Sequence, residues 1–254
     1  MITLGIDIGG SGIKGALVDT VKGEMVTDRL RIPTPQPAKP TAVIDVLKQI
    51  VDHFEYSGPI GVGIPGIVIN GVVHSAANID NDWLGFAGQQ AMAEATGCPV
   101  TLANDADVAG VAVMRFGAGK EQSGTVMIFT LGTGIGSAVF VDGRLVPNTE
   151  LGHLYLRNQK NDAESYAAER IREEKNLSWK QWGKRLNTYF QHIEFLFSPE
   201  LIIIGGGVSK KHEEYLHYIK TRATIIPAEL RNEAGIIGAA VLAAENSDAM
   251  LPAV

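Results

Sequence analysis

Residues 2–19, ITLGIDIGGSGIKGALVD, consist of two strand-like runs joined by the glycine-rich stretch GGSG. A strand, a short glycine turn and a second strand predict a β-hairpin. A dinucleotide-binding glycine loop must instead open a helix, and nothing from Ile13 to Val18 looks like a helix start. The stretch therefore predicts a hairpin with a glycine-rich turn and argues against a Rossmann-type nucleotide fold.

The second half of the chain repeats this pattern. Residues 125–146, TVMIFTLGTGIGSAVFVDGRLV, again run as strand, glycine turn and strand, and LIIIGGGVS (201–209) is an apolar strand that enters three glycines. Two halves that begin alike indicate an internal duplication. Apolar spacing and composition predict helices at residues 42–54, 86–97, 106–119, 163–175, 178–196, from about 210, and 233–245.

Composition excludes several classes of protein. The chain has 254 residues, a net charge of −6 and a single cysteine, Cys98, so no intrachain disulfide and no cysteine-based metal cluster can form. The N-terminus lacks the pattern of a signal peptide, and no stretch has about 18 consecutive apolar residues. We expect a cytoplasmic protein that binds neither membrane nor nucleic acid.

The charge is unevenly distributed along the sequence. Residues 157–222 contain 12 Lys and Arg against 9 Asp and Glu, a local balance of +3, whereas the remainder of the chain balances at −9. A basic segment of this kind is compatible with a polyanionic ligand, although for any single lysine an ordinary solvated helix face is the simpler interpretation. The overall acidity therefore does not exclude a phosphate-rich partner.

Both glycine turns are candidates for phosphate binding, because backbone N–H groups in such turns can converge on an anion. Asp7 at the end of the first strand could also hold a hydrated Mg²⁺. A plain hairpin turn beside a capping Asp is the alternative. The candidate phosphate-binding residues are Asp7, Gly9, Gly10, Ser11, Gly12 and Lys14 in the first turn, and Gly132, Thr133, Gly134 and Gly136 in the second.

Polar residues after other strands are the remaining candidates. Asp105, in the stretch Asn104-Asp105-Ala106-Asp107, could act as a general base, or the stretch could simply cap the following helix. Glu150 and His153 could bind sugar hydroxyls, or they could form a solvated turn. Asn78 lies in a polar loop where binding residues are common, although an ordinary loop is the simpler interpretation.

Together these motifs carry a family resemblance. DIGGSGIKG, GIPG, NDAD, TLGTGIGSA, ELGH and LIIIGGGVS occur in one order along essentially the whole chain, which resembles the ROK group of sugar kinases and repressors in the actin-like ATPase superfamily. The stretch 178–209, SWKQWGKRLNTYFQHIEFLFSPELIIIGGGVS, further resembles the polyphosphate glucokinases. The resemblance implies a two-domain α/β fold of the ribonuclease H-like type, with a cleft between duplicated domains.

The resemblance also implies domain limits and site residues. A small N-terminal domain is expected at 1–107, with a C-terminal helix at about 235–246 packing onto it, and a larger domain at 108–234. Asp105 matches the catalytic base. The residues that match sugar ligands are Asn78, Asn104, Glu150, His153 and Glu164, and those that match the nucleotide-facing segment are Gly205, Gly206 and Gly207.

The implied reaction is phosphoryl transfer from inorganic polyphosphate to the 6-hydroxyl of glucose, with Mg²⁺ and without the zinc that many relatives bind. An ATP-dependent hexokinase of the same family and a non-catalytic sugar sensor are the alternatives. A homodimer is expected because relatives are commonly dimers. The residues expected to line a polyphosphate track are Lys184, Arg185, Lys210 and Lys211.

Overall fold

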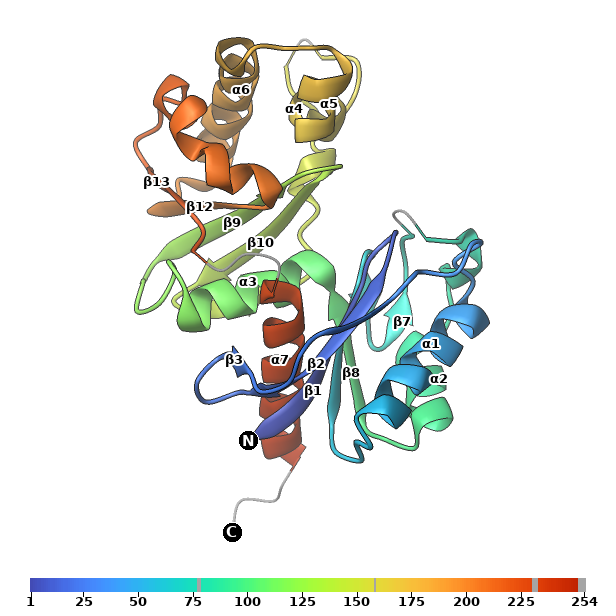
Figure 1. Cartoon of the computed structure of the whole chain (residues 1–254). Coiled ribbons are helices and arrows are strands. Elements are labelled where there is room, and N and C mark those ends of the chain that lie inside the picture. Colours follow the sequence, from blue (N-terminus) through green and yellow to red (C-terminus); the bar gives the residue numbers. More distant parts are fainter. Residues whose placement is uncertain (77–78, 158, 230–232, 251–254) are drawn as a thin grey trace. The chain divides into compact units, whose positions relative to one another are not determined.

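The computed structural model describes residues 1–76, 79–157, 159–229 and 233–250 and contains two compact units (Figure 1). The first unit comprises Met1–Ala112 and the C-terminal segment Glu233–Val254, and the second comprises Val113–Asn232. The division falls within one helix, α3 (Asp105–Phe116). The first unit is therefore discontinuous in sequence, because the end of the chain returns to it.

The first unit contains a mixed sheet in the order β3-β2-β1-β5-β8, with β4 paired to the other side of β2. Strands β1 and β2 form the expected antiparallel hairpin, and β5 and β8 continue the sheet in parallel. The strands of the first unit are β1 (Ile2–Ile8), β2 (Ile13–Asp19), β3 (Glu24–Met25), β4 (Leu30–Ile32), β5 (Ile60–Ile64), β6 (Val68–Ile69), β7 (Val72–Val73) and β8 (Val100–Asn104).

Helices cover this sheet. Helix α1 (Pro40–His53) packs against α2 (Gly88–Thr96), and α7 (Ala234–Met250) packs along β1 and β5. Figure 1 shows α7 beside β1. A short 3₁₀ turn, η1 (Asn81–Trp83), contributes the fully buried Trp83. The apolar faces of α1 and the strands bury a core that includes Leu4, Ile6, Leu47 and Val62.

Two glycines allow α7 to lie directly on the sheet. A β-carbon at Gly5 in β1 would overlap the carbonyl of Ile236, and one at Gly61 in β5 would overlap the carbonyl of Ala239. The helix backbone therefore contacts the strand backbones with no side chain between them. Because interiors are packed at crystal-like density, a methyl group has no room at either position.

The second unit repeats the first in its topology. Its sheet has the order β11-β10-β9-β12-β13, in which β9 and β10 form an antiparallel hairpin and β12 and β13 pair in parallel. This pattern matches β3-β2-β1-β5-β8 strand for strand, so the predicted duplication is confirmed. The strands are β9 (Thr125–Leu131), β10 (Ile135–Val141), β11 (Arg144–Val146), β12 (Leu201–Gly205) and β13 (Thr224–Pro227).

The long helix α6 forms much of the second core. Its side chains Trp182, Tyr189 and Phe190 are fully buried, and both Tyr189 and Phe190 pack edge-on against Phe129 of β9. Ser178 begins the helix through a capping box with Gln181. The helices of this unit are η2 (Leu151–His153), α4 (Ala163–Ala167), α5 (Glu169–Glu174), α6 (Trp179–Phe197), η3 (Gly207–Glu214) and η4 (Leu216–Tyr218).

Two helix predictions need correction. The helix expected at 163–175 is two short helices, because Ala168 adopts an extended ψ of 154° between them. The helix expected from about Lys210 is the 3₁₀ segment η3, which begins at Gly207 and contains a non-helical Lys211. Among the described residues, no helix combines the length and apolar content needed to cross a membrane.

Candidate functional site

The first glycine turn joins β1 to β2. Asp7 and Lys14 are opposite each other in the hairpin register, and the Lys14 Nζ lies 3.1 Å from the Asp7 carboxylate. The α-carbon of Gly235, at the start of α7, lies against the same carboxylate, since a β-carbon there would be 3.2 Å from the Asp7 Cγ. The turn therefore places a carboxylate and an ammonium side by side, and both are only partly exposed.

The end of β8 carries the predicted base. Asp105 is the first residue of α3 and is partly buried. The neighbouring Asn104 is buried, accepts hydrogen bonds from the backbone N–H groups of Ala106 and Asp107, and donates to the carbonyl of Gly66. Asn104 thus caps α3 and links it to the GIPG loop, which orients the first turn of the helix that holds Asp105.

The second glycine turn joins β9 to β10 and lies against the Gly205–Gly207 segment. Gly206 has a φ of 87°, and a β-carbon on it would overlap the carbonyl of Leu131. At Gly132 and Gly207, in contrast, a β-carbon would meet no atom within 4 Å. The structure therefore brings two predicted phosphate-binding segments together within the second unit and leaves open space at both glycines.

Glu164 contacts this turn directly. Its carboxylate accepts a 2.8 Å hydrogen bond from the backbone N–H of Ile135, and a β-carbon on Gly134 would overlap it. The sequence resemblance matches Glu164 to a sugar ligand but does not indicate this contact. Glu164, which the resemblance matches to a sugar ligand, is thus hydrogen-bonded to the backbone at the end of the second glycine turn, which the resemblance matches to phosphate binding.

Glu150, His153 and Glu164 form an electrostatic cluster. The pKa of Glu150 is raised, mainly because the carboxyl is buried. The charge of His153 lowers this pKa, and the charge of Glu164 raises it further. A 2.8 Å hydrogen bond from the Nδ1 of His153 to Asp162 raises the pKa of His153, to which Glu164 also contributes. A hydrogen bond at Nδ1 fixes the ring orientation and leaves Nε2 as the atom that can meet a hydroxyl.

The four predicted track residues differ in their surroundings. Arg185 donates to the carbonyl of Tyr166 at 2.9 Å and its guanidinium lies 4.9 Å from the centre of that ring, so it supports the fold locally. Lys184 and Lys210 are exposed. The Lys211 Nζ lies 5.6 Å from the ring centre of Trp179, over which the Arg172 guanidinium also packs at 4.1 Å.

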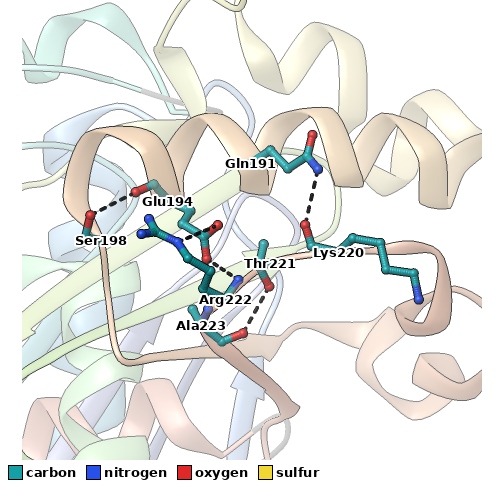
Figure 2. Close-up of polar contacts among 7 residues, drawn as sticks. All are labelled: Gln191, Glu194, Ser198, Lys220, Thr221, Arg222 and Ala223. Carbon is teal, nitrogen blue, oxygen red and sulfur yellow. Dashed lines mark hydrogen bonds and ion pairs between the residues drawn. The ribbon is translucent and has the colours of Figure 1, made fainter.

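A separate network at the end of α6 fixes the segment before β13 (Figure 2). The Glu194 carboxylate accepts backbone hydrogen bonds from Arg222 and Ala223, and Gln191 donates to the carbonyl of Lys220. The adjoining pocket contains none of the predicted site residues; it is lined by Glu194, Ser198, Pro199, Glu200, Arg222 and Ala223. We attribute a structural role to this network, because its hydrogen bonds go mainly to backbone groups.

Three side chains that contact the first glycine turn from another segment were not among the predicted site residues. Thr34, Gln36 and Arg31 donate to the carbonyls of Gly9, Gly10 and Ser11, respectively. They belong to β4 and the proline-rich loop, far from the turn in sequence, and no motif marks them. Asn78 lies outside the described residues, and among those described no cluster of three acidic, His or Cys side chains could hold a metal ion.

Comparisons with known proteins agree with this architecture. A polyphosphate glucokinase of Mycobacterium tuberculosis (strain CDC 1551 / Oshkosh) is 44% identical over 238 residues, which cover 93% of this chain and 89% of that relative. The crystal structure of the inorganic polyphosphate/ATP-glucomannokinase from Arthrobacter sp. strain KM superposes with a TM-score of 0.90 at 49% identity, covering 96% of this chain and 99% of that one.

A ROK family glucokinase from Streptomyces griseus, in complex with glucose and AMPPNP, has the same fold, with a TM-score of 0.82 at 24% identity over 96% of this chain and all of that one. The actin-like fold expected from the sequence is therefore confirmed. The family model of the ROK family matches residues 3–166. Since that match spans more than half of the sequence and the relatives align over nearly all of it, this chain belongs to the ROK family.

Proposed function

We propose that this protein transfers a phosphoryl group from inorganic polyphosphate to the 6-hydroxyl of glucose. The observation that carries the proposal is the 49% identity, at a TM-score of 0.90, to a polyphosphate/ATP-glucomannokinase along nearly the full length of both chains. The mycobacterial polyphosphate glucokinase supports the same donor and sugar. ATP as a second donor is favoured by the likeness to the solved relative, which is a polyphosphate/ATP-glucomannokinase.

Asp105 is the proposed base that accepts the proton of the attacking hydroxyl. Phosphoryl transfer depends mainly on alignment and charge stabilisation, so the base needs a fixed position more than an unusual basicity. The cap provided by Asn104 supplies that fixed position. Glu150, His153 and Glu164 are the proposed ligands of the sugar hydroxyls, because carboxylates accept and an imidazole can donate.

Mg²⁺ is part of the proposed reaction, and the Asp7 carboxylate fits the ligand preference of this ion. Mg²⁺ keeps several waters and binds proteins through one or two carboxylates together with substrate phosphates. Asp7, partly exposed at the first turn, offers one such carboxylate, and its pairing with Lys14 suits contact through a water molecule. When bound with the donor, the ion would neutralise charge on the transferring phosphate.

Lys184, Arg185, Lys210 and Lys211 remain the proposed track for the polyphosphate chain, with Lys210 and Lys211 as its principal members. Both follow Gly207 in η3, so they continue from one of the segments matched to phosphate binding. A polyanion that displaces counterions binds less tightly as salt rises. We therefore expect the logarithm of the polyphosphate affinity to fall linearly with the logarithm of the salt concentration, with a slope that grows with the number of basic side chains engaged.

A cytoplasmic homodimer completes the proposal. Phe195 and Leu196 at the end of α6 are 79% and 52% exposed, which suits a contact between two copies of the chain. Sedimentation of the wild type and of Phe195→Ser tests this assignment. A dimer that persists unchanged in Phe195→Ser would place the interface elsewhere, and a monomeric wild type would remove the dimer from the proposal.

The deciding experiment compares donors and sugars. Purified protein is assayed with polyphosphate or ATP, each with glucose, mannose and N-acetylmannosamine. The proposal expects glucose 6-phosphate to form fastest with polyphosphate. Faster turnover with ATP would favour an ATP-dependent hexokinase, and a lack of turnover with both donors would favour a sugar-binding regulator.

A further inference from the structure

The two glycine turns occupy equivalent positions in their units. In the first hairpin Ile8 pairs with Ile13, and in the second Leu131 pairs with Ile135. In each turn a hydroxyl residue is followed by one glycine and then by the returning strand. Ser11 in the first unit therefore corresponds to Thr133 in the second.

An arginine binds the carbonyl of the hydroxyl residue in the first turn. Arg31 of β4 donates from Nη2 to the Ser11 carbonyl at 2.9 Å. The guanidinium lies over the turn, because a β-carbon on Gly12 would be 2.7 to 2.8 Å from its atoms. Gly12 is therefore needed for the arginine to approach this closely.

Two further side chains from the same segment hold the preceding carbonyls. The hydroxyl of Thr34, a residue only 6% exposed, donates to the Gly9 carbonyl at 2.5 Å, and Gln36 donates to the Gly10 carbonyl at 3.3 Å. Three consecutive carbonyls of the turn are thus each bound by a side chain from residues 31–36. The Thr34 hydroxyl is buried and bonded to the turn, so it fixes the position of the Gly9 carbonyl.

The second turn is held by an arginine in the same way. Arg170 of α5 donates from Nε to the Thr133 carbonyl at 3.1 Å, and its backbone N–H donates to the Gly132 carbonyl at 3.1 Å. Its guanidinium also lies 3.8 Å from Glu174, one helical turn further along α5. Two arginines from unrelated elements therefore bind corresponding carbonyls in the two halves of a duplicated fold.

Binding a carbonyl also orients the next amide. The peptide unit is planar and trans, so the C=O of one residue and the N–H of the following residue point in opposite directions. Holding the Ser11 carbonyl fixes the N–H of Gly12, and holding the Thr133 carbonyl fixes the N–H of Gly134. A set of N–H groups fixed in advance is what an anion-binding turn requires.

We propose that Arg31 and Arg170 are matched positioning residues, each of which orients the amides of one glycine turn for the phosphate oxygens of the donor. The identity of the donor rests on the function proposed above. The arginines act through the turn backbone, and Thr34 assists Arg31 in the first unit.

The test uses neutral and charge-conserving variants at both sites. Arg31→Met and Arg170→Met should each raise the KM for polyphosphate and for ATP about tenfold, which is the effect of losing one hydrogen bond to a positioned group. The KM for glucose should change less than twofold. The double variant should raise the donor KM more than either single variant does. Exposed Arg29→Gln and Arg144→Gln serve as matched controls in the two units.

Two variants separate positioning from charge. Thr34→Val removes the hydrogen bond to the Gly9 carbonyl without altering charge. It should raise the donor KM severalfold and leave its salt dependence unchanged. Arg31→Lys keeps the charge but lacks the planar fork, so it should resemble the Met variant more than the wild type. A normal donor KM in both Thr34→Val and Arg31→Lys would overturn the proposal, as would unchanged donor KM values in the Met variants.

The proposal can be judged even if the proposed function fails. Should the wild type phosphorylate no sugar, calorimetric titration with tripolyphosphate measures the turns directly. The Met variants should then bind it about tenfold more weakly than the wild type and the two controls. Equal binding by all variants, or no binding to the wild type, would overturn the positioning role.

Discussion

The carboxylate of Glu164 accepts a 2.8 Å hydrogen bond from the backbone N–H of Ile135, the first residue after the second glycine turn. This hydrogen bond joins a proposed sugar ligand to a proposed phosphate-binding turn. Gly134 permits it, because any side chain there would overlap the carboxylate. The sugar and phosphate roles proposed for the second unit therefore depend on the same side chain.

The first prediction concerns the charge of Glu164. Glu164→Gln should raise the KM for glucose about tenfold, because a hydrogen bond to a charged acceptor is about twice as strong as one to a neutral amide. Steady-state kinetics with varied glucose at saturating donor measures the change. Glu173→Gln, a carboxylate that is 66% exposed, is the control and should match the wild type. An equal KM for both variants would contradict a sugar-binding role for Glu164.

The second prediction concerns the proposed base. Asp105→Asn should lower kcat by about 10² to 10⁴, the usual contribution of general base catalysis, with little change in glucose affinity. Kinetics and calorimetric glucose titration of the same preparation measure both quantities. Asp45→Asn, an exposed carboxylate on α1, serves as the control. A kcat near that of the wild type would remove Asp105 from the role of base.

The third prediction concerns pH. Asp162 raises the pKa of His153, so Asp162→Asn should lower it. A raised histidine pKa stabilises the fold fully below the unfolded value of about 6.5, and this contribution is lost as pH rises through the folded value. His153 is exposed and Asp162 is partly exposed, so the contribution to the free energy of unfolding is about 0.5 kcal/mol or less. NMR titration of His153 measures the pKa, and an unchanged value in Asp162→Asn would contradict the assignment.

The fourth prediction concerns the α6 network shown in Figure 2. Burial raises the pKa of Glu194, but the backbone hydrogen bonds from Ala223 and Arg222, together with the Arg222 guanidinium, outweigh it, so the pKa is lowered. Glu194→Gln should lower the free energy of unfolding by about 1 to 2 kcal/mol at pH 7. A lowered carboxyl pKa stabilises above the unfolded value of about 4.3, so the difference from the wild type should shrink as pH falls below it. Urea unfolding at pH 7 and pH 4 measures this, with Glu200→Gln as a nearby comparison.

The hairpins and glycine turns could be predicted because their signals are local. The alternation in residues 2–19 and 125–146 and the glycines between the strands lie within one short stretch each. The helix predicted at 178–196 also agrees closely with α6 (Trp179–Phe197). Such short patterns reflect the local preference of the residues for strand, turn or helix, which can be read without knowing the tertiary structure.

The supports of the turns could not be predicted in the same way. Arg31 lies 20 residues from Ser11, and Arg170 lies 37 residues from Thr133. Their contacts depend on strand pairing and helix placement, which no local pattern encodes. The η3 segment was mispredicted for a related reason. Gly206 has a positive φ and packs against Leu131, and this sets the path of the backbone into η3. The residues after Lys210 do not indicate that contact.

The close packing of α7 on Gly5 and Gly61 has a consequence for synthesis of the chain. The Asp7 carboxylate rests against Gly235, which is added only after more than nine-tenths of the sequence has been made. Until α7 leaves the ribosome, β1 and β5 expose the backbone surface that the helix will cover. The second unit, being continuous, has all of its residues available earlier. The first glycine turn to be translated is thus the last to acquire its complete surroundings.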